Sequence, residues 1–205
     1  MKTIVLPLNE AAVKALKVGE VVLLQGKIVT ARDRAHKWLY ETFIGKKTPP
    51  SPEDLVAYER IKMCLAGGAI YHCGPIVKES KDGWEVIAAG PTTSEREEPY
   101  EAPIMQHFSV RAVIGKGGMG KGTLRACQEV PAVYLHAVGG AAVVAAKKVK
   151  RVLEVFKLNF GMPEAMWVFE VEDFPAIVTM DAQGESLHEE VFRHSEALFC
   201  KLISG

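Results

Sequence analysis

The sequence is poor in cysteine, and its cysteines lack the spacing of a metal site. Four occur in 205 residues, namely Cys64, Cys73, Cys127 and Cys200. No two of them form a C-x-x-C pair, whereas a closed zinc site or an iron–sulfur binding run needs such tight local spacing. We therefore expect buried, reduced thiols in a cytosolic protein and no metal bound by this chain.

An excess of one charge and long apolar runs are also lacking. Lys and Arg together number 25, as do Asp and Glu, so the net charge is zero. This balance argues against a nucleic-acid footprint or a polybasic membrane patch, and its low self-repulsion suits a chain that works in a complex. The apolar runs fall far short of the roughly 20 residues that span a bilayer. Residues 1–10 lack a small-residue cleavage site, so we expect a first strand there, not a signal peptide, and a cytoplasmic protein.

The sequence does contain enough apolar material for one domain, predicted over residues 1–205. Hydrophobic residues make up 48% of the chain, which suffices to bury a core. Helix patterns and strand patterns are mixed, which predicts an α/β domain around a mixed sheet. Strands are expected at 3–6, 20–30, 69–74, 84–90, 110–115, 131–136, 150–158 and 166–180, with 69–74 and 84–90 paired as a hairpin. Helices are expected at 9–17, 32–43, 51–67 and 184–203, and after the segments 90–98 and 114–122.

Local signals place several boundaries of these elements. Asn9 and Ser51 are expected to cap the helices that follow them, the second with Asp54 three residues later. Gly26 is expected to bend the strand that contains it. The closing helix is predicted to be amphipathic, with an apolar face formed by Leu187, Val191, Leu198 and Leu202.

A dense cluster of charge, Thr30 to His36, follows a β-branched strand at the start of a helix. In open α/β sheets, ligands gather where strands give way to helix N-termini, and an arginine there can hold a carboxylate through two parallel hydrogen bonds. The alternative is that Thr30 caps the helix, Asp33 favours its dipole and the arginines are solvated.

The segment GPTTSER, residues 90–96, places three hydroxyls after Gly-Pro. Thr92 or Thr93 could simply cap a helix whose first turn is acidic. However, Arg96 interrupts the acidic run and opposes the helix dipole, and a residue set against its local electrostatic preference suggests a ligand.

Two glycine-rich segments follow further strands. The segment IGKGGMGKG, 114–122, fits neither phosphate-loop pattern, which disfavours a nucleotide and favours an anion-binding loop with Lys116 as a point charge. The segment YLHAVGGAAVVAAKK is explained by close strand–helix packing at Gly139 and Gly140, with His136 as a core histidine.

Six segments, taken together, resemble one family over nearly the whole chain. They are GKIVTARDRAH, GAIYHCGPI, AAGPTTSER, GKGGM, HAVGGAAV and EVEDFPAIV. In this order they are similar to the beta subunit of class I, iron–sulfur-dependent fumarate hydratases and of L-tartrate dehydratases. The patterns TARD-x-AH and GPTTS-x-R are the most specific. The interval 41–67 is longer than the family pattern leads us to expect, and SEREE replaces an apolar residue near Arg96.

The resemblance implies a single swivelling β/β/α-type domain and assigns roles to matched residues. Arg32, Arg96 and Lys116 would bind the substrate, with Lys116 also catalytic, and Thr92 would accept the proton. Asp33 and His36 match the motif as possible supporting residues.

The resemblance also implies a hetero-oligomer. An alpha subunit would carry a 4Fe-4S cluster on its own cysteines, and one of its irons would bind the dicarboxylate directly. The pair would be a hydro-lyase that reversibly hydrates fumarate to L-malate, as in the tricarboxylic acid cycle, and would be active only with the alpha subunit. The alternatives are a tartrate dehydratase that yields oxaloacetate, or a dicarboxylate-binding module without a catalytic partner.

Overall fold

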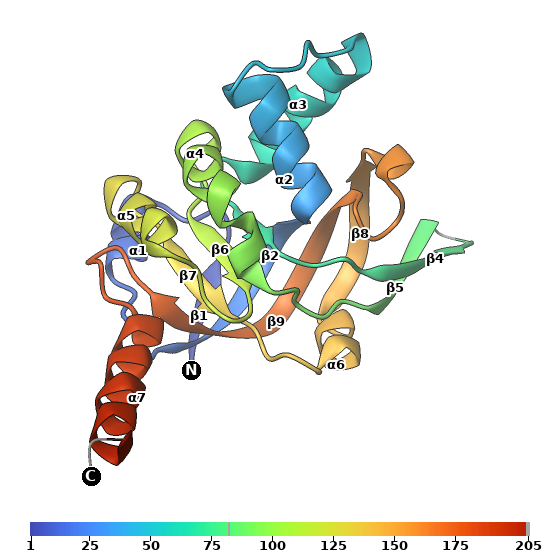
Figure 1. Cartoon of the computed structure of the whole chain (residues 1–205). Coiled ribbons are helices and arrows are strands. Elements are labelled where there is room, and N and C mark those ends of the chain that lie inside the picture. The colour runs from blue at the N-terminus through green and yellow to red at the C-terminus, as the bar shows by residue number, and fades with distance from the viewer. Residues whose placement is uncertain (82, 204–205) are drawn as a thin grey trace.

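A computed structural model describes residues 1–81 and 83–203, and within them one mixed sheet organises the fold (Figure 1). Its strands follow the order β1-β2-β3-β6-β7-β9-β8. Their bounds are β1 (Lys2–Val5), β2 (Val21–Thr30), β3 (Ala69–Tyr71), β6 (Ala112–Gly115), β7 (Val133–His136), β8 (Val149–Phe156) and β9 (Met166–Met180). The predicted α/β class with a mixed sheet is confirmed.

The sheet closes on itself through its longest strand. Strands β2, β3, β6 and β7 are parallel neighbours, and β9 runs antiparallel to β7 on one edge and to β2 along the other. The β2–β9 register shifts between Leu24 and Gly26, so the predicted bend at Gly26 is confirmed. Gly26 has φ 110°, and a Cβ there would lie 2.7 Å from the Leu6 carbonyl oxygen, which explains why glycine is needed.

The described helices are α1 (Glu10–Lys14), α2 (Asp33–Leu39), α3 (Pro52–Leu65), α4 (Glu98–Phe108), α5 (Lys121–Glu129), α6 (Ala142–Ala146) and α7 (Leu187–Ile203). Helices α2, α3, α4 and α5 cover the outer face of this ring, whereas α1 and α6 contribute Val13 and Ala146 to the other apolar cluster. A π-helical turn (Tyr40–Ile44) continues α2, and 3-10 turns occupy Ser94–Glu97 and Leu158–Phe160. Alternate residues of each central strand face two separate apolar clusters, so that Ile70 packs toward α2, α4 and α5 while Tyr71 packs inside the ring.

The predicted helix caps are confirmed. Asn9 Oδ1 accepts a hydrogen bond from the Ala12 amide at 2.8 Å. Ser51 and Asp54 form a reciprocal capping box, with bonds of 2.9 and 3.1 Å. The long interval 41–67 thereby becomes the π-helical turn and α3, whose Ile61 and Leu65 join the core.

The predicted hairpin between segments 69–74 and 84–90 is wrong. Residues 69–71 form β3, which lies in the main sheet between β2 and β6. The hairpin is instead β4 (Ile76–Ser80) with β5 (Gly83–Ala88). All three residues of β3 are buried, as is typical of a parallel strand covered on both faces, whereas β4 is mostly exposed.

The closing helix α7 is confirmed as a helix but does not bury its apolar face. It projects away from the rest of the molecule (Figure 1), and none of its residues is buried. Val191, Leu198 and Leu202 are 56%, 58% and 81% exposed. No helix in the described part of the chain combines the length and the apolar character needed to cross a membrane.

Candidate functional site

The sequence motifs meet at one edge of the sheet. Parallel strands end at the same edge, and here Thr30, Tyr71 and Ile114 are consecutive register partners, while Gly115 pairs with His136. The charged cluster, the segment HCG and the two glycine-rich loops each follow one of these strand ends. Loops far apart in the sequence therefore become neighbours at the carboxyl ends of these parallel strands.

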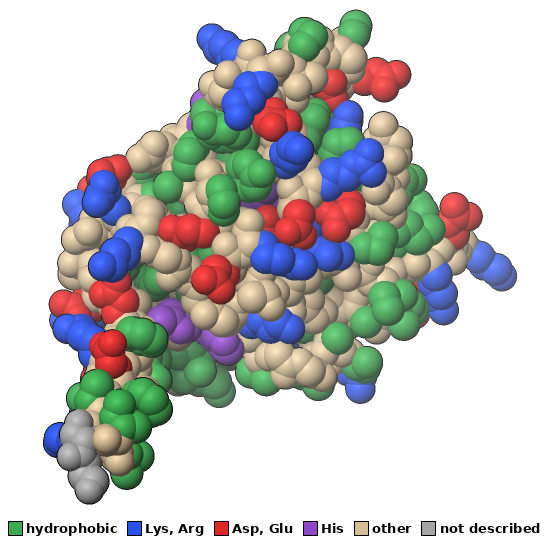
Figure 2. Space-filling view, viewed as in Figure 1, with side chains coloured by type: hydrophobic (Ala, Val, Ile, Leu, Met, Phe, Trp, Pro, Cys, Tyr) green, Lys and Arg blue, Asp and Glu red, His purple; other side chains and the backbone are tan. Residues whose placement is uncertain are grey.

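Two arginines from different motifs approach the same carboxylate. Arg96 Nη2 lies 3.4 Å from Asp33 Oδ2, and Arg32 Nη2 lies 4.0 Å from the same oxygen. The side chains of Arg32, Asp33 and Arg96 are 22%, 44% and 49% exposed. Across the middle of the face in Figure 2, below α2 and α4, acidic and basic side chains alternate. The structure thus brings together three of the predicted site residues on a surface that solvent reaches.

Two residues that the sequence analysis missed help to place Arg32. Glu164 Oε1 lies 3.3 Å from Arg32 Nη1. A Cβ at Gly74 would lie 2.6 Å from Arg32 Nη1, so the segment HCG needs glycine for the guanidinium to pass. A glycine directly after a predicted strand was the available signal for Gly74, whereas Glu164 had none, because its loop carries no motif.

Thr30 does not cap helix α2, as one alternative had it. Arg32 occupies the N-cap position, and no side chain caps that helix. Thr30 Oγ1 instead accepts a hydrogen bond from the Trp167 amide at 2.9 Å and donates to the Ala165 carbonyl at 3.4 Å. Thr30 therefore joins the end of β2 to the start of β9.

The threonine loop is fastened between β3 and the first glycine loop. The Thr92 amide and hydroxyl both donate to the His72 carbonyl oxygen, at 2.7 and 3.3 Å. Thr93 forms a β-bridge with Lys116, and the Ser94 amide donates to the Lys116 carbonyl oxygen at 3.0 Å. Thr93 stands at the N-cap position without a capping bond, so neither threonine caps the following turn. This geometry sets Thr92 and Lys116 on adjacent loops, while their chemical roles stay predictions.

The helix after the glycine loop already has an anion at its N-terminus. The Glu98 carboxylate accepts hydrogen bonds from the amides of Gly120, Gly122 and Thr123, at 2.8, 2.9 and 3.2 Å, and from the Thr123 hydroxyl at 2.7 Å. An internal carboxylate therefore fills the place that a phosphate takes in nucleotide-binding loops. The sequence analysis missed Glu98, which it assigned only to an acidic first turn.

Beneath the surface lies a layer of fully buried polar side chains. Glu101 Oε2 is 3.1 Å from His36 Nε2 and 2.8 Å from His72 Nε2. His72 Nδ1 is 2.8 Å from Ser94 Oγ, which accepts a 2.8 Å hydrogen bond from the Tyr134 hydroxyl. His36, predicted as a supporting residue, is buried and does not reach the surface.

Burial and mutual contact shift the pKa values of this layer. Burial opposes the charge on His36, but Glu101 and Glu97 outweigh it and raise the pKa of His36 to about 9. Burial lowers the pKa of His72. Burial also opposes the charge on Glu101, yet the two histidines lower its pKa to about 2. The Glu97 carboxyl lies 3.8 Å from His36 Nδ1, and burial raises its pKa to about 7, with Asp33 and Glu101 adding to the shift and His36 and Arg96 opposing it.

The cysteines of this chain do not fit an iron–sulfur cluster. Cys64 lies on α3, Cys73 follows β3, Cys127 lies on α5 and Cys200 on α7. Burial raises the pKa of Cys73 and of Cys127 to about 12. Among the described residues, no cysteine belongs to a group of side chains close enough together to hold a metal ion. The expectation of burial holds for these two, is only partly met by Cys64, and is wrong for the exposed Cys200.

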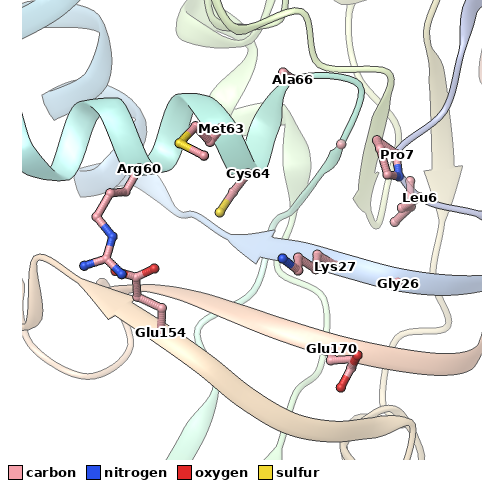
Figure 3. Close-up of a pocket in the computed structure, with 11 residues that line it drawn as sticks. Leu6, Pro7, Gly26, Lys27, Arg60, Met63, Cys64, Ala66, Glu154 and Glu170 are labelled. Atoms are coloured by element: carbon pink, nitrogen blue, oxygen red, sulfur yellow. The ribbon is translucent and has the colours of Figure 1, made fainter.

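A cavity of about 510 Å³ has none of the predicted site residues in its lining (Figure 3). It opens between α3, β2 and the β8–β9 pair, and Lys27, Arg60 and Glu154 project from its walls. Arg60 Nη2 already pairs with Glu154 Oε1 at 2.9 Å. Arg60 therefore has a carboxylate partner within this cavity, as Arg32 and Arg96 have at the strand ends.

The fold and the strand-end motifs define a class of protein: an α/β domain that gathers arginine, lysine and threonine at one edge of a closed mixed sheet. The family described as Fumarase C-terminus matches residues 2–191. The chain belongs to this family.

Among its relatives is a putative fumarate hydratase class I of Geobacillus stearothermophilus, 47% identical over 94% of this chain. A putative L(+)-tartrate dehydratase subunit beta of Methanocaldococcus jannaschii is 42% identical over 90% of the chain, and the L(+)-tartrate dehydratase subunit beta of Escherichia coli K12 is 38% identical over 92%. The chain spans 34% of the length of the first relative, but 89% and 87% of the other two.

Proposed function

We propose that this chain is the beta-type half of a hydro-lyase that reversibly hydrates fumarate to L-malate. The observation that carries the proposal is the convergence of Arg32 and Arg96, 64 positions apart in the sequence, on one carboxylate oxygen of Asp33. A substrate carboxylate would take the place of this internal anion. Exchange is easy because exposed ion pairs contribute only about 0–1 kcal/mol.

The reaction explains why cations are needed. Dehydrating malate removes a proton from a carbon beside a carboxylate, and the carbanion-like state puts extra negative charge on the carboxylate oxygens. Fixed donors aimed at developing charge stabilise a transition state by about 3 kcal/mol each. Arg32, Arg96 and Lys116 would supply such donors to a dianion.

Thr92 is the proposed proton acceptor. Its hydroxyl hydrogen points to the His72 carbonyl oxygen, which leaves the oxygen lone pairs able to accept a bond from the substrate. A neutral hydroxyl is a weak base, so this role requires nearby cations that lower its pKa. We assign this task to Lys116, which lies on the loop that Thr93 bridges.

The proposal places the 4Fe-4S cluster on an alpha-type partner chain. When bound, the cluster would supply a Lewis acid for the leaving hydroxyl. The scattered positions of the cysteines of this chain support that division, and the subunit names of the tartrate dehydratase relatives support a separate partner.

A tartrate dehydratase beta subunit is the second candidate. The chain spans 89% and 87% of the length of two such subunits. Tartrate differs from malate by one hydroxyl, and the arginine pair suits both dicarboxylates.

The test is turnover by a reconstituted pair. This chain, co-expressed without oxygen with an alpha-type chain of the family, is assayed on fumarate, L-malate, meso-tartrate and L-tartrate. We expect a brown, iron-containing complex that acts fastest on fumarate and L-malate. Faster turnover of a tartrate would favour the second candidate. A colourless chain that binds dicarboxylates without forming an active pair would make it a binding module and refute both.

A further inference from the structure

A continuous chain of hydrogen bonds runs through the buried layer. It links five side chains from different elements: Tyr134 of β7, Ser94 of the 3-10 turn, His72 after β3, Glu101 of α4 and His36 of α2. The side chains of His36, His72, Ser94 and Glu101 have no solvent exposure. We refer to these five side chains as the buried network.

The partners fix where each proton lies. A carbonyl only accepts, so His36 Nδ1, 3.0 Å from the Arg32 carbonyl oxygen, carries a proton. Glu101 Oε2, when ionised, also only accepts, so the facing nitrogens of His36 and His72 carry protons as well. His36 is then an imidazolium. A serine hydroxyl can donate or accept, but burial lowers the pKa of His72, so this ring is neutral and its Nδ1 accepts from Ser94, which in turn accepts from Tyr134.

This proton arrangement also explains why a metal is not needed here. His36, His72 and Glu101 offer ligand atoms within 4.8 Å of one another, as a metal site would. Each of the four ring nitrogens already has a hydrogen-bond partner of matching polarity. The His36 imidazolium also balances the Glu101 carboxylate, and Glu97, 3.8 Å from His36 Nδ1, is a further buried acid beside the pair.

The network touches the backbone beside the proposed site residues. His36 bonds to the carbonyl of Arg32. The carbonyl of His72 accepts both bonds from Thr92. Ser94 donates its amide to the carbonyl of Lys116.

From this connection we propose that Glu101 is a positioning residue, which holds the loops of Arg32, Thr92 and Lys116 in register through His36, His72 and Ser94. Its catalytic consequence rests on the proposed function, whereas its effect on the loops does not. Glu101 does not touch substrate, since it is buried. One carboxylate oxygen accepts from two histidines on separate elements, so its loss frees both at once.

The test variant is Glu101→Gln, which keeps the size of the side chain and removes its charge. One amide atom cannot serve both histidines, because a neutral His36 would need a donor where His72 needs an acceptor. The matched control is Glu129→Gln. Glu129 accepts a single surface hydrogen bond from Gln106 and lies on α5, outside the network.

Hydrogen exchange on the full chain measures the positioning directly. In Glu101→Gln we expect the amides of Thr92 and Ser94 to exchange at least 10-fold faster, while amides of the β8–β9 pair keep their rates. Nitrogen NMR of the wild-type chain should show His36 doubly protonated and His72 singly protonated at pH 7.5. Unchanged exchange at Thr92 and Ser94, or a singly protonated His36, would overturn the proposal.

Turnover of the reconstituted pair measures the consequence. A misplacement of about 1 Å can reduce the rate about 100-fold. We therefore expect Glu101→Gln to lower kcat, expressed per folded complex and measured below the melting temperature of the variant, about 10- to 100-fold. A purely structural role predicts a lower melting temperature with wild-type kcat. If Glu101→Gln does not fold, Ser94→Ala replaces it and should show the same two changes, faster exchange at Thr92 and lower kcat, to a smaller extent. Wild-type exchange at Thr92 in Ser94→Ala would refute the network. An inactive wild-type pair would refute the proposed function but leave the exchange test intact.

Discussion

The strand-end surface, formed by Arg32, Asp33 and Arg96, and the buried network differ in their exposure to solvent and in the contacts that hold them. Arg32, Asp33 and Arg96 are 22–49% exposed and held by ion pairs of 3.3–4.0 Å. His36 and Glu101 are fully buried and joined at 3.1 Å. The surface pairs are weak and can exchange with a ligand, whereas a buried pair that loses one partner leaves an uncompensated charge. The surface is thus suited to binding and the network to holding shape.

Thr92→Val should produce the largest fall in kcat of the reconstituted pair. That result would show that Thr92 acts in chemistry, as the strand-end surface does, and not only in holding shape. Valine keeps the shape and β-branching but removes the hydroxyl. Loss of a proton acceptor reduces the rate about 100- to 10,000-fold. The Thr92 hydroxyl makes no capping bond and donates one long hydrogen bond, 3.3 Å to the His72 carbonyl, while the backbone amide keeps its own bond to that carbonyl, so the melting temperature should fall only slightly. Thr93→Val is the matched control and should keep kcat within a few-fold. A wild-type rate in Thr92→Val would move the proton acceptor to another hydroxyl or to the partner chain.

Lys116→Met should have the next largest effect. It removes one charged donor to a dianion, worth roughly 1.5–3 kcal/mol, or about 10- to 100-fold in kcat/KM of the reconstituted pair. Lys121→Met is the control, since Lys121 is an exposed lysine at the other end of the same glycine-rich segment. Equal losses in the two variants would mean that the loop contributes only its overall charge.

Glu97→Gln tests the buried side of the comparison, because Glu97 is a buried carboxyl beside His36 of the network. The pKa of Glu97 is raised from 4.5 to about 7, so its contribution to stability is complete below pH 4.5 and is lost as the pH rises through about 7. The neutral glutamine avoids that loss. At pH 8 we expect the variant to have a free energy of unfolding higher by on the order of 1–3 kcal/mol, and at pH 4.5 little difference.

Urea unfolding at both pH values checks this prediction. Glu95→Gln, an exposed neighbour on the same turn, should show no such pH dependence. Destabilisation of Glu97→Gln at pH 8 would show that Glu97 is an ionised partner of His36 and not a strained, buried acid.

Ser51→Ala should have the smallest effect. It shows how kcat responds when stability alone is reduced. Ser51 caps α3 on a part of the molecule remote from both regions. Loss of the cap should reduce the free energy of unfolding by about 1 kcal/mol and leave kcat unchanged. A change of kcat in this variant would mean that activity follows global stability, and it would weaken every mutational argument above.

The sequence predicted the elements better than their partners. Caps and the bend at Gly26 rest on local chemistry, so Ser51 and Gly26 were found. The partner of segment 69–71 depends on long-range pairing, which is why the hairpin was misplaced. The surface motifs were found because arginine and hydroxyl clusters stand out. Glu98 and Glu101 were missed, because an acidic residue in a helix has the same sequence signature whether it is solvated or buried.

The apolar face of α7 shows the same limit. Periodicity identified the helix and its face, but it could not show whether the face is covered, since that depends on what lies beside it. Val191 and Leu198 have the spacing of core positions and are more than half exposed.

The central claim, that the strand-end surface binds the dicarboxylate, is tested most directly by the double variant Arg32→Ala/Arg96→Ala in the reconstituted pair. Iron content and melting temperature are measured beside kcat/KM on L-malate, with Arg125→Ala, an exposed arginine on α5, as the control. We predict wild-type iron content, a nearly unchanged melting temperature and loss of turnover by at least 100-fold, since two charged contacts of roughly 1.5–3 kcal/mol each are removed. Turnover within a few-fold of wild type, with the cluster present, would contradict the account.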